Sequence, residues 1–190
     1  MSEAQFISQL KAGDASAFRV LVDKYSRKIY NTVLSILQNK EDAEDVTQEV
    51  FVEIFRSISR FKGESLLSTW IYRIGISKSL EFLRKKNRKK RFILEKLDNE
   101  VAGYINEIPF FHHPGIQLEN KERAAILFAA MKKLPEKQQS AFVLHKIEGL
   151  PYSEIAAILD TTLPAIESLM FRAKQNLQKL LGDYYEKNEK

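Results

Sequence analysis

Cysteine is absent from this chain of 190 residues, and proline and glycine are scarce, with five and seven copies. Without a thiol, neither a disulfide framework nor a thiolate metal site can form. No apolar run approaches the length of a bilayer span, and the N-terminus lacks the basic flank and long apolar core of a signal peptide. The composition, 44% hydrophobic and 29% charged, is that of an ordinary soluble protein. We therefore expect a cytoplasmic protein of one large or two small domains.

Catalytic signatures are absent as well. The sequence contains no phosphate-binding loop, no nucleophile elbow and no cluster of metal-ligand residues. The adjacent pair His112 and His113 would chelate a metal poorly, because no carboxylate or thiol is near it in a loop-like segment. We expect no enzyme activity, no cofactor, no metal and no small-molecule substrate.

Charge is divided unevenly along the chain. Residues 1–91 hold 18 Lys and Arg against 11 Asp and Glu, a net charge of +7. Residues 92–190 hold 12 against 14, a net charge of −2. The first half is therefore the first candidate for contact with a polyanion, and the second half needs another source of affinity.

Apolar side chains recur at three- and four-residue spacing through most of the chain, which predicts an all-α fold. The pattern predicts two helices within residues 5–38, and Asp14 can cap the second. Asn39 is a good N-cap for a third helix, whose acidic first turn suits the helix dipole. The core stripe of this third helix consists of Ala43, Val46, Val50, Ile54 and Ile58.

The third helix carries six acidic residues and no basic one between Glu41 and Glu53. Such a run is often only a solvated face. Phe51 and Phe55 lie off the centre of the apolar stripe and widen it, however, so the pattern also fits a protein partner with a basic surface.

The stretch from Ser65 to Arg91 predicts a long helix, because it lacks proline and holds one glycine. It contains the only tryptophan and ends in seven basic residues out of eight. One helical stripe collects Trp70, Arg73, Ser77, Glu81, Arg84 and Arg88, whereas Tyr72, Ile76 and Leu83 fall on a face suited to a core. An aromatic platform beside cations suits single-stranded nucleic acid. The alternative is a buried Trp70 and a solvated basic helix end, which the helix dipole also favours.

Residues 93–118 form a linker by composition, with two prolines, two glycines and weak helical periodicity. They separate two expected helical domains, residues 1–92 and 119–190. In the second domain, Gly149 ends one helix and Pro151 begins the next element. A short helix from Tyr152 to Leu159, a three-residue turn and a longer helix from Leu163 onward then fit a helix-turn-helix, although a generic helical hairpin is the alternative.

With both ends considered, the chain resembles the extracytoplasmic-function sigma factors of bacterial RNA polymerase, within the sigma-70 superfamily. EDAEDVTQEVFVEIF resembles the segment that docks on the clamp helices of polymerase, and KGESLLSTWIYRIGISKSLEFLRK resembles the segment that recognises and melts the promoter −10 element. LPEKQQSAFVLHKIEGLPYSEIAAILDTTLPAIESLMFRAKQNL resembles the −35-binding module, which also touches the polymerase flap. The resemblance implies a sigma factor that binds core polymerase and promoter DNA, nucleates strand opening and is commonly held by an anti-sigma factor.

The resemblance assigns residues to three surfaces. The polymerase-binding set is Asp42, Glu44, Asp45, Gln48, Glu49 and Phe51. The −10 DNA set is Lys62, Ser65, Trp70, Tyr72, Arg73, Ser77, Arg84, Lys85 and Arg88, although Tyr72 also fits a core position. The −35 DNA set is Thr162, Pro164, Ala165, Glu167, Ser168, Arg172 and Lys174.

Three positions depart from the family pattern. Ser77 stands where the family usually has asparagine, and Glu167 and Leu169 stand where basic residues are common. These departures concern which bases are recognised and leave the modules themselves intact. A stand-alone helix-turn-helix regulator would explain the C-terminal half, but it leaves the acidic helix and the Trp70 stripe without a purpose.

Overall fold

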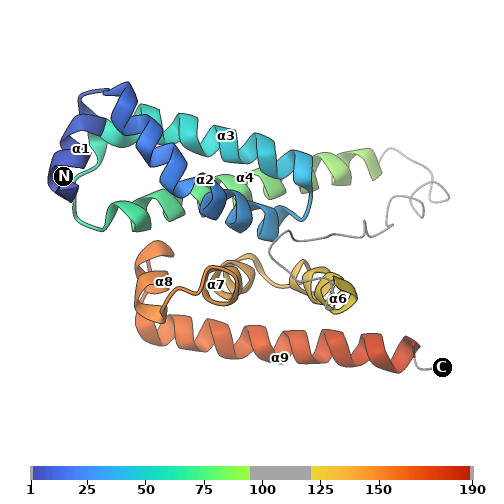
Figure 1. Ribbon diagram of the computed structural model, residues 1–190. Helices are drawn as coiled ribbons and strands as arrows, with labels where there is room; N and C mark the ends of the chain where they lie inside the picture. Colours follow the sequence, from blue (N-terminus) through green and yellow to red (C-terminus); the bar gives the residue numbers. More distant parts are fainter. Residues whose placement is uncertain (1, 95–120, 189–190) are drawn as a thin grey trace.

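The computed structural model describes residues 2–94 and 121–188, and every regular element within these ranges is a helix (Figure 1). The first group, called the N-terminal bundle, comprises α1 (Glu3–Lys11), α2 (Ala15–Leu37), α3 (Lys40–Ser57), the 3-10 turn η1 (Ile58–Arg60) and α4 (Leu67–Leu94). The second group, called the C-terminal bundle, comprises α6 (Lys121–Met131), α7 (Glu136–Lys146), α8 (Tyr152–Ile158) and α9 (Leu163–Asn188). The all-α prediction is confirmed.

Local sequence signals set the helix ends. The Asp14 carboxylate accepts hydrogen bonds from the main-chain N–H groups of Ser16 and Ala17, at 2.8 and 3.2 Å, and so caps α2. The Asn39 side chain caps α3 in the same way. Gly149 has φ +70°, a conformation that glycine adopts without strain, and it ends the segment after α7. These caps and stops lie where the sequence predicts them.

The core of the N-terminal bundle lies where α2, α3 and α4 meet. Ile29, Ile54 and Ile71 are completely buried there, and burying each such side chain contributes about 1.5–3 kcal/mol. Gly75 of α4 is buried against Ile29 of α2, and a Cβ atom at this position would make an ordinary van der Waals contact with Ile29 at 3.6 Å.

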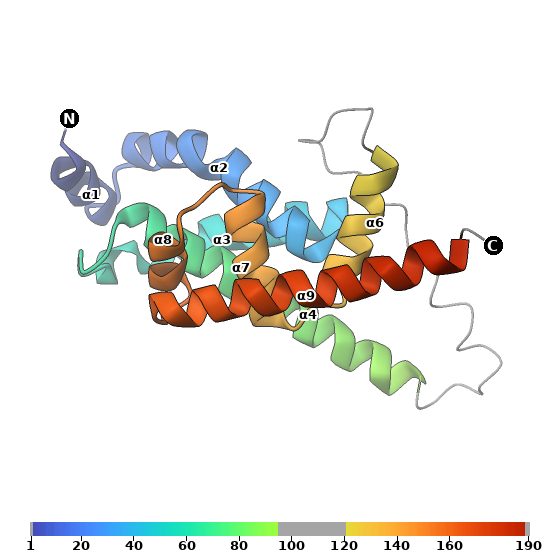
Figure 2. The ribbon, with the colours of Figure 1, turned by 90° about the horizontal axis from the view of Figure 1, so that it is seen from below.

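Helix α7 lies in the middle of the molecule. It packs against α2 on one side and against α9 on the other, and seven consecutive residues, Gln138 to Leu144, are buried. Helix α9 lies on the far side of the C-terminal bundle from the N-terminal bundle (Figure 1). Seen from below, it runs across α8, α7 and α6 (Figure 2). The two bundles therefore pack directly together, an arrangement that we call the docked arrangement.

The segment predicted as a linker lies almost entirely outside the described residues. Helix α4 continues to Leu94, so residues 93 and 94, the first two of the predicted linker, are helical. The pair His112 and His113 also lies outside the described ranges. The boundaries at residues 92 and 119 stay predictions.

Candidate nucleic-acid and protein interfaces

One side of α3 presents acidic and apolar side chains together. Asp45, Gln48 and Glu49 are exposed, and the next turns of the helix add Val52, which is 47% exposed, and Phe55, which is 55% exposed. We call these five residues the α3 face. Phe55 also packs edge-on against Phe18 of α2, with ring centroids 5.2 Å apart. Exposed apolar side chains among acids are typical of a surface that another protein covers.

Three other predicted polymerase-binding residues have different surroundings. Phe51 is 9% exposed and belongs to the core, whereas Phe55, which was predicted beside it to widen the apolar stripe, and Val52 reach solvent. Asp42 accepts a hydrogen bond from Lys86 of α4 and ties the start of α3 to α4. Glu44 is exposed and lies 3.8 Å from Lys40.

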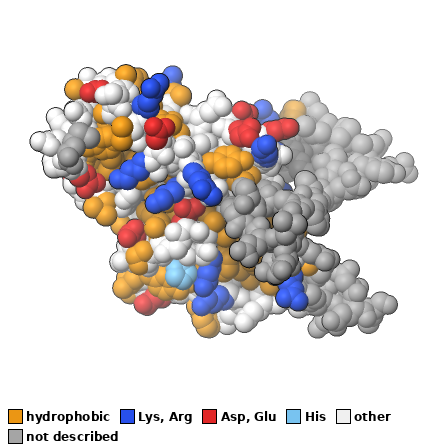
Figure 3. Space-filling view, viewed as in Figure 1, with side chains coloured by type: hydrophobic (Ala, Val, Ile, Leu, Met, Phe, Trp, Pro, Cys, Tyr) orange, Lys and Arg blue, Asp and Glu red, His pale blue; other side chains and the backbone are white. Residues whose placement is uncertain are grey.

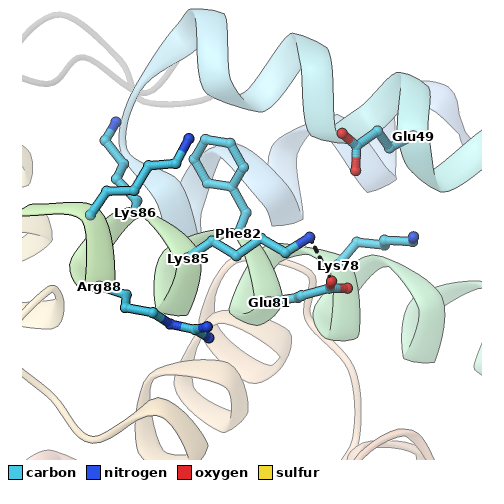
Figure 4. A pocket seen from close by; sticks show the side chains of 8 residues that line it. Glu49, Lys78, Glu81, Phe82, Lys85, Lys86 and Arg88 are labelled. Atoms are coloured by element: carbon cyan, nitrogen blue, oxygen red, sulfur yellow. Dashed lines mark ion pairs between the residues drawn. The ribbon is translucent and has the colours of Figure 1, made fainter.

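A basic groove of 530 Å³ runs between α3 and α4 (Figure 4). Glu49 of α3 lines one side, and α4 contributes Lys78, Glu81, Phe82, Lys85, Lys86, Arg88 and Lys89. Lys86 lies over the Phe82 ring, with its ammonium 5.7 Å from the ring centroid. The Glu81 carboxylate is 2.8 Å from the Lys85 ammonium and raises the pKa of Lys85 by hydrogen bonding and by charge attraction. Lys78, Lys85 and Lys86 pair with Glu53, Glu81 and Asp42, so Arg88 and Lys89 carry the surplus positive charge of this groove, which suits a polyanion.

Trp70 is half-buried. Its ring packs against Phe61, just before α4, with the centroids 5.2 Å apart and the planes tilted by 48°. Trp70 is therefore neither fully buried nor fully exposed, and its role toward nucleic acid stays a prediction. Lys62 and Ser77 are exposed, and Ser65 is half-buried.

Three predicted DNA-binding residues of α4 instead contact the C-terminal bundle. The Tyr72 hydroxyl donates to Glu148 Oε2 at 2.9 Å, and Tyr72 is only 5% exposed. Arg73 donates from Nε and Nη2 to the main-chain oxygen of Ala157, at 2.9 and 2.6 Å. Arg84 holds both carboxylate oxygens of Glu136, with contacts of 3.1, 3.1 and 2.6 Å. In the docked arrangement, each of these three side chains donates a hydrogen bond to an acceptor in the C-terminal bundle.

The Tyr72 and Glu148 pair has shifted proton affinities. Burial raises the pKa of the Tyr72 hydroxyl, and the neighbouring Glu148 charge raises it further. Burial also raises the pKa of the Glu148 carboxyl, and the hydrogen bond from Tyr72 offsets part of that rise. Lys28 of α2 also lowers the Glu148 pKa by charge attraction.

The start of α9 is exposed. Thr162 caps it, since its hydroxyl accepts from the N–H of Ala165 at 3.4 Å. Pro164, Glu167, Ser168 and Lys174 face solvent, and Ala165 is half-buried. The exposed Arg172 bends back along the helix, with Nη2 2.7 Å from the Ser168 hydroxyl. The exposed Phe171, at 63%, joins this surface and was not in the predicted set.

Sequence reasoning did not find the residues that join the two bundles. Besides Glu136 and Glu148, two buried amides cross the junction: Gln38 Nε2 donates to the main-chain oxygen of Phe128 at 2.6 Å, and Gln139 Nε2 donates to that of Ile36 at 3.3 Å. The signal in the sequence that could have found them is that α7, EKQQSAFVLHK, lacks the apolar stripe of an ordinary surface helix. On the face shown in Figure 3, Lys and Arg side chains lie near acidic ones around the middle of the molecule.

Other kinds of site find no support in the part of the chain that the structure describes. No group of three His, Asp or Glu side chains there is arranged to hold a metal ion. None of the described helices has the length and apolar character needed to traverse a bilayer.

Comparison with known proteins gives the class of the chain. Residues 21–89 match the family model of sigma-70 region 2, and residues 124–177 match that of sigma-70 region 4. The RNA polymerase sigma-H factor of Pseudomonas aeruginosa is 30% identical over 186 residues, covering 94% of this chain and 93% of the relative. The ECF RNA polymerase sigma-E factor of Escherichia coli is 30% identical over 179 residues, covering 92% of each. The chain belongs to the extracytoplasmic-function group of sigma-70 factors, which direct RNA polymerase to specific promoters.

Solved structures agree with this fold. CnrH in complex with the cytosolic domain of CnrY matches with a TM-score of 0.65 at 22% identity, covering 94% of this chain and 96% of that one. The sigma factor RpoE in complex with the anti-sigma factor NepR from Bartonella quintana matches with a TM-score of 0.66 at 21% identity, covering 87% of this chain and 96% of that one.

Proposed function

We propose that this sigma factor directs promoter-specific initiation through three separate surfaces. The α3 face binds core RNA polymerase, α4 and the loop before it recognise and open the −10 element, and the start of α9 contacts the −35 element. The protein performs no catalysis of its own and works in the cytoplasm, where it meets polymerase. The observation that carries the proposal is the side-by-side placement of an acidic, apolar face and a basic groove on α3 and α4.

The α3 face suits a basic protein surface. Asp45 and Glu49 supply charge that steers association, and Val52 and Phe55 supply apolar area that leaves water on binding. Clamp helices of core polymerase are the expected partner of this face, and the flap is the expected partner of the C-terminal bundle.

Helix α4 suits unstacked DNA. Trapping one base on an aromatic ring contributes about 1–3 kcal/mol, whereas unpairing costs about 1.4 kcal/mol for each base-pair step. Trp70 can therefore hold an opened base or two but cannot sustain a whole bubble. The basic groove with Lys85 and Arg88, together with polymerase, supplies the remaining attraction for the phosphates.

The start of α9 suits the major groove, because most side chains of its first turns are exposed and α9 lies on the side of the C-terminal bundle away from the N-terminal bundle. Arg172 can donate to guanine or to a phosphate, and Glu167 can accept from the amino group of cytosine. The C-terminal half carries a slight negative charge, so we expect useful −35 binding only when polymerase tethers it.

Binding to immobilised core polymerase without DNA tests the proposal. Reversing Asp45 and Glu49 to Lys together should weaken binding at least about tenfold, while the fold survives because exposed charge changes alter stability by no more than about 0.5 kcal/mol. The pair Glu3→Lys and Asp23→Lys, on exposed positions of α1 and α2, makes the same change in net charge as a control. Equal affinities of the two double variants would place the polymerase contact elsewhere.

The same assay separates the proposal from its rival. A stand-alone helix-turn-helix regulator would bind DNA without retaining core polymerase. An anti-sigma factor remains an expected further partner, and run-off transcription from a promoter library with purified core polymerase would define the promoters.

A further inference from the structure

Helix α2 carries a line of cations that none of the surfaces described above uses. Lys24, Arg27 and Lys28 recur at three- and four-residue spacing together with Asn31, so the four side chains follow one line along the helix. We call these four residues the α2 row. The three cations are exposed and Asn31 is half-buried. The row is therefore accessible to a partner in the docked arrangement.

The pairing of charges distinguishes the α2 row from α4. Four cations of α4 each pair with an acid: Lys78, Arg84, Lys85 and Lys86. Among the residues that the structure describes, no acid forms an ion pair with a cation of the α2 row. Lys24 lies over the Tyr25 ring, with its ammonium 5.4 Å from the centroid, and Lys28 acts on Glu148 at longer range, by lowering its pKa through charge attraction. A polyanion can bind this row without first displacing an acid.

A hollow connects the α2 row with the start of α4. It has a volume of 350 Å³ and lies where α1, α2 and α4 meet. Its lining includes apolar and aromatic side chains, one cation and one acid: Phe6, Val20, Tyr25 and Leu67, with Lys24 and Glu3. Leu67 is the first residue of α4 and precedes Trp70 by three positions, and Val20 is 50% exposed. Apolar surface therefore lies between Trp70 and the cations of the row.

We propose that the α2 row and this hollow hold the single-stranded DNA that continues beyond the base on Trp70. This inference rests on the proposed function of α4. Single-stranded nucleic acid binds where a basic track runs beside apolar and aromatic surface, because the phosphates contact the charges and the bases contact the apolar groups. The α2 row supplies the charges, and the hollow supplies the apolar surface.

The order of the chain gives the direction of the strand. The −35 element lies upstream of the −10 element, and the chain reaches its −35 module from the C-terminal end of α4. The start of α4, with Trp70, is therefore expected on the downstream side. Helix α1, which lines the hollow, lies at this same end of the N-terminal bundle (Figures 1 and 2). The α2 row thus extends the DNA contacts downstream of the −10 element, where an opened promoter is single-stranded.

The alternative is that the α2 row is only a solvated face, with the exposed Asp23 balancing part of its charge. The two interpretations differ in salt dependence. Each phosphate that a protein neutralises on a single strand contributes about 0.7 to the slope of log affinity against log salt concentration. Replacing the three cations should therefore reduce that slope by about two and weaken binding by at least about tenfold at low salt.

The test uses the full chain, in which the row is exposed, and a fluorescent oligo(dT) or a duplex of the same length. Anisotropy is measured over a range of salt concentrations. The triple variant Lys24→Gln, Arg27→Gln and Lys28→Gln removes the charges of the row. The control variant Lys133→Gln, Lys137→Gln and Lys179→Gln removes the same charge from exposed positions of the C-terminal bundle. Circular dichroism confirms that each variant is folded.

A second pair of variants tests the hollow. Val20→Asp places an acid in the hollow without removing a cation, and it should weaken oligo(dT) binding more than duplex binding. Val52→Asp makes the same change at a similarly exposed position of α3, 47% against 50%, and should leave oligo(dT) binding unchanged.

We expect the row variant to lose slope and affinity for oligo(dT), and the control variant to resemble the wild type. With core polymerase, the row variant should shorten the lifetime of open promoter complexes and leave closed complexes unchanged. Equal salt slopes in the row and control variants would overturn the inference, as would equal weakening of oligo(dT) and duplex binding. An unchanged open-complex lifetime would overturn the downstream placement. All three results are compatible with the proposed function, which fails instead if the wild type neither binds core polymerase nor initiates transcription.

Discussion

Arg73 of α4 caps the end of a helix in the other bundle. Its guanidinium donates from two nitrogens to the main-chain oxygen of Ala157, 84 positions further along the chain. Helix α8 has only seven residues, and the last carbonyls of any helix lack partners within it. A cation at this end is also favoured by the helix dipole. One arginine therefore stabilises the first helix of the helix-turn-helix from outside.

Replacing Arg73 with Ala should loosen the turn after α8. We expect the main-chain amides of Leu159 and Thr161, which bond to Ile155 and Ala156, to exchange with solvent about two- to fivefold faster. Hydrogen exchange followed by mass spectrometry measures this change. Arg60→Ala, at an exposed position of η1, is the control, and equal exchange in the two variants would show that Arg73 does not stabilise the turn.

Replacing Trp70 with Ala should impair strand opening more than closed-complex formation. Permanganate reactivity of promoter thymines measures the opened bases, and filter binding at low temperature measures the closed complex. Because Trp70 is only half-buried, stability should fall by about 1–3 kcal/mol, rather than the larger loss of a fully buried aromatic. Trp70→Phe retains a stacking surface and should retain most of the opening. Normal opening by a folded Trp70→Ala protein would reject the stacking role.

Replacing Glu167 with Lys should change the preferred −35 sequence and also raise non-specific DNA affinity and its salt dependence. Glu167→Gln separates the two effects, because it removes the charge and keeps an acceptor. If Glu167 only stabilises the start of α9, worth about 0.3–1 kcal/mol, both variants will select the wild-type −35 sequence from a promoter library.

Docking of the bundles should strengthen as the pH falls through the window between the pKa of Glu148 in the separated state and its higher pKa in the docked state. Glu148 faces Tyr72 of α4 and Lys28 and Thr32 of α2, and burial raises its pKa when the bundles are docked. Between the pKa of the separated state and the higher pKa of the docked state, the docked form binds more protons, so lowering the pH favours it. Raising the pH through that window weakens docking. Energy transfer between a donor on one bundle and an acceptor on the other measures docking. Glu148→Gln should remove the part of the pH response that Glu148 causes. An identical pH response in the wild type and the variant would show that Glu148 is not the titrating group.

Much of the fold follows from local rules. Asp14 and Asn39 cap helices as predicted, and Ala43, Val46, Val50, Ile54 and Ile58 are all buried, because periodicity and capping act over a few residues. Phe51 shows the limit of such rules, since an off-centre position on a stripe becomes core when a neighbouring helix covers it. The docked arrangement could not be predicted from the sequence, because Arg84 and Glu136 are 52 positions apart. No local pattern shows whether these two side chains pair with each other or are each exposed to water.

The two buried glutamines at the junction bear on how the protein survives separation of its bundles. Gln38 and Gln139 each donate to a main-chain oxygen of the opposite bundle. When the bundles separate, water can hydrogen-bond to both amides and both main-chain oxygens, whereas a wholly apolar junction would expose two hydrophobic surfaces. Molecules with separated bundles should therefore stay soluble at concentrations at which a more hydrophobic interface would cause aggregation. Replacing both glutamines with leucine would make the pair of bundles hold more firmly and would make the parted chain prone to self-association.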